Sequence, residues 1–213
     1  MIVAIDGPAA SGKGTIAKRV AAHYGLAYLD TGTLYRAIAR DTLARGGDPA
    51  DAGEALKSAE ALDPSTLSDP SLRKPGLGEA ASLVAKHPEV RKELLAYQRS
   101  FARAKSGAVL DGRDIGTVIC PDADVKLFVT ATPEERARRR YLELEQAGIG
   151  VSEAEVLYDI RRRDERDKHR AAAPLRRAPD AHLLDTTNLD IDAAFKAAIE
   201  LIDAALARAG YAD

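Results

Sequence analysis

The sequence predicts an α/β protein in which a parallel β-sheet carries helices on both faces. Five short apolar runs alternate with longer segments of helical apolar spacing, an order that favours parallel strands. Each run ends at Asp, Thr or Gly, residues that are typical of turns. A glycine-rich segment with a lysine separates the first run from the first helical segment. Because ligands of such sheets bind at the carboxyl ends of the strands, we expect a site along this edge.

The predicted strands are the five apolar runs. They cover residues 2–5, 26–29, 108–110, 125–129 and 181–184. None of the runs is longer than five residues, which agrees with buried strands bounded by turn residues.

The predicted helices of the core lie between these runs. They cover residues 12–24, 33–45, 133–147 and 190–209. Thr31 is the expected cap of the second helix. Thr132 is followed by proline and two glutamates, which is typical of a capped helix start with an acidic first turn. The fourth helix runs into Ala-Arg-Ala-Gly, a typical helix stop.

Two segments interrupt the strand–helix alternation. Residues 63–78 hold three of the ten prolines and predict a loop, with helix-like flanks at 50–62 and 79–105. Residues 148–180 form the second insertion. We therefore expect one domain, with a core at 1–45, 106–147 and 181–213, and insertions at about 46–105 and 148–180.

Composition narrows the classes of protein. The 213 residues carry a formal net charge of −2, which argues against a general nucleic-acid binder. The single cysteine, Cys120, excludes an internal disulfide framework and fits a reducing compartment. No apolar run approaches the roughly 18 residues of a membrane span, and no signal peptide is visible. We expect a cytoplasmic monomer with no membrane partner.

The strongest motif is a phosphate-binding loop between the first strand and the first helix. Backbone amides in such a loop bind phosphate oxygens, and glycines allow close approach. Lys13 would bridge the β- and γ-phosphates of ATP. The expected ATP-binding residues of the loop are Gly7, Pro8, Ala9, Ala10, Ser11, Gly12, Lys13, Gly14 and Thr15.

The loop departs from the general motif at one position. Gly14 stands where a Ser or Thr hydroxyl normally holds Mg²⁺. We therefore expect Mg²⁺ to be held by nucleotide phosphates and water, with no direct protein ligand. Thr15 would donate to a phosphate. Asp111, at the end of a strand predicted to lie beside the first, would orient waters on the ion.

Three further motifs follow the phosphate loop in order. They are DTGTLYR at 30–36, DGRDIGTV at 111–118 and RDERDKHR at 163–170. Together with the loop, they closely resemble bacterial cytidylate kinases, which belong to the nucleoside monophosphate kinases of the P-loop class. The resemblance runs from residue 2 to residue 206 and is weak only at 63–78.

The resemblance implies a fold and a reaction. The fold would be a P-loop kinase with a five-stranded parallel core, an acceptor-binding insertion at about 46–105 and a mobile lid at about 148–180. The reaction would transfer a phosphoryl group from ATP, with Mg²⁺, to CMP or dCMP. Thr31 and Arg36 would contact the acceptor nucleotide, and the fork of Arg36 suits its phosphate.

The basic insertion supplies the remaining cations. Residues 161–177 hold eight Lys or Arg and three acids. Arg163, Arg166, Asp167 and Arg170 have the spacing of one helix face. Closing this face over a triphosphate would relieve the repulsion between its arginines. The resemblance implies catalytic roles for Arg163, Asp167 and Arg170, together with Lys13. It also implies that Arg166 binds ATP. Arg163 and Asp167 would in addition lie near the acceptor.

Base choice is assigned to four residues. Asp114 can accept from the N4 amine of cytosine, and Arg113 can donate to its acceptors. The resemblance adds Ser82 and Arg91. Uracil would leave Asp114 facing a carbonyl, a mismatch that costs on the order of 1–3 kcal/mol.

Three other functions stay open on the sequence. The first is another small P-loop kinase, acting on UMP, AMP or a non-nucleotide acceptor. The second is a nucleotide-binding module without catalysis. A nucleic-acid binder that uses residues 161–177 is the third, and the net charge disfavours it.

Overall fold

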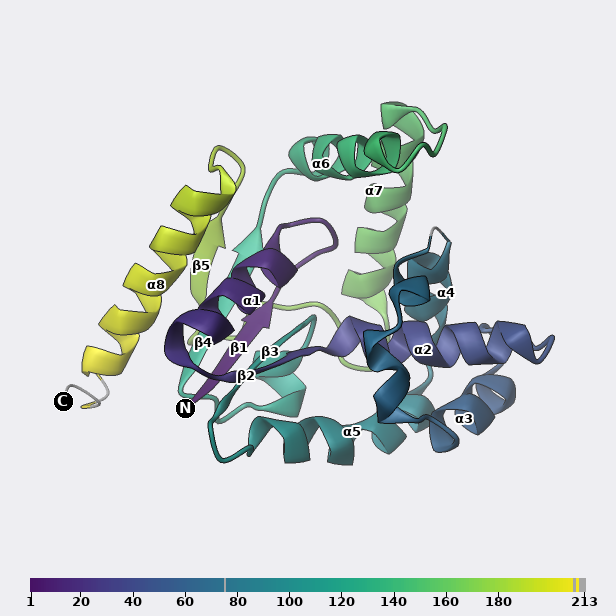
Figure 1. Ribbon diagram of the computed structural model, residues 1–213, viewed down its shortest axis with the longest axis horizontal. Helices are drawn as coiled ribbons and strands as arrows, with labels where there is room; N and C mark the ends of the chain where they lie inside the picture. Colours follow the sequence, from purple (N-terminus) through teal and green to yellow (C-terminus); the bar gives the residue numbers. More distant parts are fainter. Residues whose placement is uncertain (75, 209, 211–213) are drawn as a thin grey trace.

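The computed structural model describes residues 1–74, 76–208 and 210. Five parallel strands form one sheet in the order β2-β3-β1-β4-β5 (Figure 1). The strands are β1 (Ile2–Asp6), β2 (Ala27–Asp30), β3 (Ala108–Gly112), β4 (Val125–Thr130) and β5 (His182–Asp185). The predicted fold class and all five strands are confirmed, with boundaries shifted by one or two residues.

The sheet aligns the carboxyl ends of its inner strands. Asp6, the last residue of β1, lies opposite Gly112 of β3, and Asp30 of β2 lies opposite Asp111. The inner residues of β1 and all of β3 are buried, which explains why these strands read as continuous apolar runs.

Helices cover both faces of the sheet (Figure 1). Val3 and Ile5 of β1 face a core that includes α1 (Lys13–Tyr24) and α8 (Ile191–Arg208). The opposite face, with Ala4 and Leu110, packs against the helices of the first insertion. The predicted end of the last helix, residue 209, and the core residues 211–213 lie outside the described residues.

The first insertion is more helical than the sequence predicts. It follows the core helix α2 (Thr31–Ala44) and contains α3 (Ala52–Glu60), α4 (Leu77–Val84) and α5 (Pro88–Ala102). The helix-like flank expected at 79–105 is helical but consists of two helices, because His87 is extended before Pro88, where one helix ends and another begins.

The proline-rich segment 63–78 is also not a plain loop. It forms two short 3₁₀ helices, Pro64–Ser68 and Pro70–Arg73, and then enters α4. In both, proline is the first residue, and the preceding Asp63 or Asp69 accepts from the backbone two residues on. Pro75 lies outside the described residues.

The two predicted threonine caps have different outcomes. Thr132 accepts from Glu135 N at the start of α6 (Pro133–Gln146), as expected. Thr31 is not a cap, because α2 already begins there, and its Oγ1 donates to the backbone oxygen of Asp111 at 2.8 Å. The hydroxyl therefore joins the start of α2 to β3.

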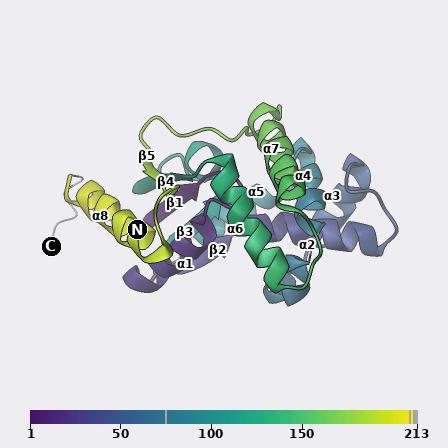
Figure 2. The same cartoon turned by 90° about the horizontal axis from the view of Figure 1, so that it is seen from above.

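The second insertion contains α7 (Glu153–His169), which lies between α6 and α4 (Figure 2). Ser152 and Glu155 form a capping box at its start. The side chain of Arg136 in α6 is buried and binds both carboxylate oxygens of Asp164 in α7, at 3.0 and 2.6 Å. No helix among the described residues is long and apolar enough to cross a membrane.

Candidate active site

The phosphate loop has the geometry of an anion site. At Gly7 a Cβ would lie 2.0 Å from the backbone oxygen of Val129, so only glycine fits. Gly12 caps α1 with a left-handed φ of 82° and no side-chain cap. The amides of the first turn of α1 therefore face the loop without a capping side chain, and the buried Ser11 Oγ has no hydrogen-bond partner. An anion bound there would satisfy such donors.

A cleft of about 530 Å³ opens beside the loop. Its end nearest the loop is lined by Ala9, Ala10 and four cations, Lys13, Arg36, Arg113 and Arg163. The rest of its lining comes from α6, α7 and the segment between them, and from Leu72, Lys74, Gly76, Gly78 and Glu79. We call it the donor cleft.

The cations of the donor cleft are only partly paired. No hydrogen bond or ion pair holds Lys13 Nζ within the described residues, and burial with nearby Arg113 lowers the pKa of Lys13 to about 8. The Nε atoms of Arg36 and Arg163 are buried without a partner. Burial and Arg113 also lower the pKa of Arg163 to about 10. An anion in the cleft would relieve all of these costs.

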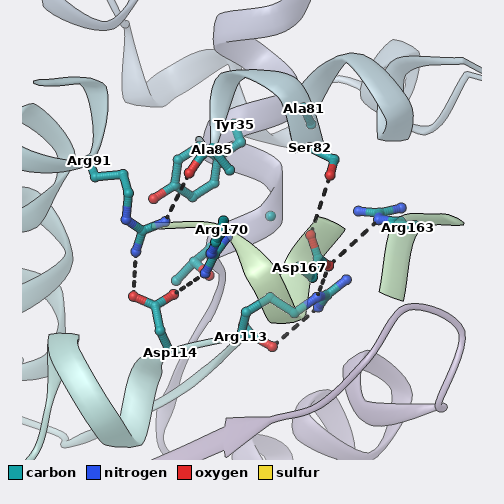
Figure 3. A pocket seen from close by; sticks show the side chains of 13 residues that line it. Tyr35, Ala81, Ser82, Ala85, Arg91, Arg113, Asp114, Arg163, Asp167 and Arg170 are labelled. Carbon is teal, nitrogen blue, oxygen red and sulfur yellow. Dashed lines mark hydrogen bonds and ion pairs between the residues drawn. The ribbon is translucent and has the colours of Figure 1, made fainter. Parts of the chain in front are cut away.

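A second cavity, of about 50 Å³, lies between α2, α4, α7 and the end of β3 (Figure 3). We call it the acceptor cavity. It holds only a few waters at this volume. Its lining residues are Thr31, Gly32, Tyr35, Ala81, Ser82, Ala85, Arg91, Gly112, Arg113, Asp114, Arg163, Asp167 and Arg170.

Asp114 and its two arginine partners form one side of the acceptor cavity (Figure 3). Its Oδ2 accepts from Arg91 and its Oδ1 from Arg170, at 3.3 Å for the latter. The side chains of Asp114, Arg91 and Arg170 are each less than 10% exposed. The Tyr35 ring lies 5.7 Å from the guanidinium carbon of Arg91.

Asp167 organises the other side. It accepts from Arg113 Nε at 3.0 Å and from Ser82 Oγ at 3.3 Å, and Arg163 Nε lies 4.0 Å away. Burial opposes ionisation of Asp167, but Arg113 and Arg163 hold its pKa below the ordinary value. Arg113 and Arg163 line both cavities, so they mark where the two meet.

A third acidic group lies under the phosphate loop. Asp111 is buried at the end of β3, and its Oδ2 accepts from Tyr28 Oη at 2.5 Å. Burial and the neighbouring Asp30 raise the pKa of Asp111, while Lys13 and Tyr28 oppose the rise. Burial also raises the pKa of Tyr28, so its hydroxyl stays a donor.

This acidic pair fits the Mg²⁺ expected with ATP. Asp30 and Asp111 lie opposite each other in the sheet and both interact electrostatically with Lys13. In the described part of the chain, no three His, Cys, Asp or Glu gather where they could hold a metal ion unaided. Mg²⁺ commonly binds to substrate phosphates and waters with one or two carboxylates beside it, and Asp111 could supply that carboxylate.

The structure brings most predicted residues to these two cavities. Thr31, Ser82, Arg91, Asp114, Asp167 and Arg170 line the acceptor cavity alone. Arg36 lines the donor cleft instead, where its Nη2 is held by Asp30 at 2.5 Å and by Thr33 at 2.8 Å.

Two lid residues depart from the expected helix face. Arg170 follows the end of α7 at His169 and has extended backbone, so it does not belong to that face. Arg166 lines neither cavity and pairs with Glu79 of α4. Arg170 therefore lies beyond the helix and pairs with Asp114, whereas Arg166 stays within α7 with its side chain bound to Glu79.

Sequence reasoning missed the tertiary partners of these residues. Glu79 has no local signal that marks it as the partner of Arg166. Tyr28 resembles an ordinary aromatic strand residue, and Tyr35 an ordinary helix residue. Only the fold places each beside a charged group of the site.

Fold and site together define a P-loop phosphotransferase. The family model "Cytidylate kinase" matches residues 3–204. A curated cytidylate kinase from Rhodopseudomonas palustris is 59% identical over 204 residues, covering 96% of each chain. Another, from Nitrobacter winogradskyi, is 57% identical over 212 residues and covers 100% of both chains. The chain belongs to the cytidylate kinase family, so the resemblance predicted from its motifs is confirmed.

The fold has a counterpart among solved structures. The crystal structure of an uncharacterized protein from Eubacterium ventriosum has a TM-score of 0.57 at 17% identity. It covers 95% of this chain and 98% of that chain. At this identity the likeness concerns the fold alone.

Proposed function

We propose that this protein transfers the γ-phosphoryl group of ATP to CMP and dCMP. The activity is the one that the name of its family denotes. The observation that carries the proposal is that two polar cavities meet at Arg113 and Arg163, with the phosphate loop on one side only. ATP would occupy the donor cleft and the monophosphate the acceptor cavity.

On the donor side, the first-turn amides of α1 and Lys13 would hold the β- and γ-phosphates. Thr15, the next polar residue of the loop, would donate to a phosphate oxygen. When bound, Mg²⁺ would neutralise charge on these phosphates, with Asp111 facing its waters. The glycines of the loop keep the backbone close enough for these contacts.

On the acceptor side, the far wall would read the base. Asp114 can accept from the N4 amine of cytosine, while Arg91 and Ser82 can donate to N3 and O2. The ion pairs of Asp114 with Arg91 and Arg170 hold its carboxylate in place. Uracil would then present a carbonyl to a buried carboxylate, which is unfavourable. Asp167 would hold the sugar side of the cavity.

Arg113 was predicted to read the base, and its position supports a second role. Its Nε is held by Asp167, its Nη1 donates to Gly112 O at 3.2 Å, and it lines both cavities. With Arg36 and Arg163 it would therefore neutralise the transferring phosphoryl group. Phosphoryl transfer needs this positioning and charge neutralisation, since little covalent chemistry falls to the protein.

The lid must open before a nucleotide enters the acceptor cavity. About 50 Å³ is far below the few hundred Å³ of a small-molecule site. In the structure Asp114 and Asp167 hold Arg170 and Arg163 near the cavity. Opening α7 would separate these groups, and closing it over both nucleotides would exclude water from the reacting phosphates. Arg166 would turn from Glu79 to ATP in that step.

The decisive experiment measures ADP formation from ATP and Mg²⁺ with five acceptors offered separately. Turnover with CMP and dCMP, and little with UMP, AMP and GMP, is the expected result. Turnover with another monophosphate would keep the phosphate-transfer machinery and discard the base roles of Ser82, Arg91, Arg113 and Asp114. ATP binding without turnover on any acceptor would favour the non-catalytic module.

The same preparation tests the remaining expectations. We propose a monomer that acts on free nucleotides in the cytoplasm. Sedimentation at micromolar concentration should give the mass of one 22.7 kDa chain. Binding of nucleic acid through residues 161–177 would contradict the proposal and would weaken steeply with salt.

A further inference from the structure

Side chains from strands β2 and β3 occupy the space beside Gly14. A Cβ at Gly14 would lie 3.6 Å from Asp111 Oδ2 and 3.8 Å from Tyr28 Oη. The general phosphate loop projects a Ser or Thr side chain from this position to hold Mg²⁺. Here the loop lacks that hydroxyl, and the hydroxyl of Tyr28 reaches to within van der Waals distance of the same point.

The strand geometry explains how Tyr28 arrives there. Tyr28 lies two residues before the end of β2, and β2 pairs with β3 so that Asp30 is opposite Asp111. The long side chain therefore runs toward the carboxyl end of β3. Its Oη donates to Asp111 Oδ2 at 2.5 Å.

Hydrogen bonds hold Asp111 at both its backbone carbonyl and its side-chain carboxylate. Its backbone oxygen accepts from Thr31 Oγ1 at 2.8 Å, and its Oδ2 accepts from Tyr28. Its Oδ1 accepts no hydrogen bond from the described residues. The carboxylate is thus fixed with one oxygen engaged and one oxygen left for another donor, such as a metal-bound water.

We propose that Tyr28 is a positioning residue that replaces the missing hydroxyl of the phosphate loop and aims the Asp111 carboxylate at the hydrated Mg²⁺ of the donor. The inference rests on the proposed function, because it takes Mg²⁺ with ATP as the ligand of the donor cleft. It adds a residue from β2 to a task that P-loop proteins usually perform within the loop itself.

The test compares metal binding in four variants. Mn²⁺ serves as the probe, titrated with a non-hydrolysable ATP analogue and followed by electron paramagnetic resonance. Tyr28→Phe removes only the hydroxyl and keeps a strand-forming aromatic ring. We expect it to weaken Mn²⁺ binding in the complex about tenfold, the lower range for losing a group that orients a metal site. Affinity for the analogue in EDTA should stay unchanged.

A serine hydroxyl introduced at position 14 should compensate for the hydroxyl that Tyr28→Phe removes. A serine at position 14 fits, since its Cβ makes only ordinary contacts. We expect Gly14→Ser to restore most of the lost Mn²⁺ affinity in combination with Tyr28→Phe, and to add little when Tyr28 is present. This non-additivity is the signature of two groups that serve one purpose.

Tyr24→Phe is the matched control. Tyr24 Oη donates to Asp203 at 2.6 Å between α1 and α8, so its loss removes the same kind of bond away from the site. Both single variants should melt at similar temperatures, and only Tyr28→Phe should change Mn²⁺ binding.

Three results would overturn the proposal: unchanged Mn²⁺ affinity in Tyr28→Phe, an equal loss of analogue affinity in EDTA, or no rescue by Gly14→Ser. The titrations contain no acceptor. They therefore stay informative if the wild-type protein fails to phosphorylate CMP, which would contradict the proposed function separately.

Discussion

The two cavities that meet at Arg113 and Arg163 are built in opposite ways. In the acceptor cavity, buried carboxylates already pair with the arginines, and about 50 Å³ remains. In the donor cleft, Lys13 has no ion pair within the described chain, and about 530 Å³ stays open. The buried ion pairs of the acceptor cavity neutralise its arginines without a ligand, whereas the charge of Lys13 in the donor cleft would be neutralised by a bound anion.

The difference fits the proposed ligands. A pyrimidine base and a sugar offer N–H and O–H donors, so their pocket needs acceptors such as Asp114 and Asp167. Phosphates offer only acceptors and negative charge, so their site needs cations and amides. The acceptor cavity accordingly contains buried carboxylates, whereas the cleft beside the phosphate loop contains a lysine without an ion pair among the described residues.

Lys13→Ala should give the largest effect, because it removes the one cation at the phosphate loop that has no ion pair within the described chain. We expect kcat to fall about 10³-fold, the upper range for losing one group that stabilises transition-state charge. Melting temperature should hold or rise, because burial disfavours this charge. ADP release and thermal melting are the measurements, and Lys196→Ala, on the exposed side of α8, is the control. Near-normal turnover would remove Lys13 from the reaction.

Asp114→Asn should change selectivity. Its amide can donate to the O4 carbonyl of uracil, where the carboxylate could not. The preference for CMP over UMP in kcat/KM should fall about 10- to 100-fold, from on the order of 1–3 kcal/mol of mismatch. Steady-state kinetics with both acceptors provide the measurement. Asp122→Asn, in an exposed loop, should leave the ratio unchanged, and an unchanged ratio in Asp114→Asn would exclude Asp114 from base recognition.

The donor cleft should respond to pH. Because the pKa of Lys13 is lowered to about 8, the lysine is charged below pH 8 and loses its proton above it. ATP affinity should therefore be full at pH 7 and about tenfold weaker at pH 9. Calorimetric titration at several pH values measures this. Lys13→Arg stays charged across the range, so its affinity should show no such loss; the same loss in both proteins would assign it to another group.

Glu79→Gln should have the smallest effect. Glu79 holds Arg166 and Arg162 of the lid and is itself about one-third exposed, so solvent screens the pair. We expect KM for both substrates to rise two- to fivefold, with kcat little changed, because closed α7 would lose the contact of Arg162 with Glu79. Hydrogen exchange in α7 should become faster. Glu93→Gln, at an exposed position of α5, is the comparison, and equal kinetics in both variants would argue against a role in closing.

The features that the sequence predicts correctly are those whose signals lie within a few residues of one another. The alternation of apolar runs, the glycine loop and the Thr132 cap depend on neighbours within a few residues, and the structure confirms them. The 3₁₀ turns differ from the expected loop at 63–78 because proline also starts helices, and the break at Pro88 differs from the helix-like flank predicted at 79–105 for the same reason. The partners of Arg166 and Asp111 come from distant segments, so no pattern in the sequence could reveal them.

The guanidinium of Arg136 joins α7 to the phosphate loop. Arg136 binds Asp164 of α7 with both of its terminal nitrogens, and one of them also donates to Ala9 O at 3.2 Å. These bonds tie α7 to the phosphate loop at Asp164. If α7 opens as proposed, a movement that keeps these bonds would rotate the helix about Asp164, so the residues farthest from Asp164 along α7 would move most.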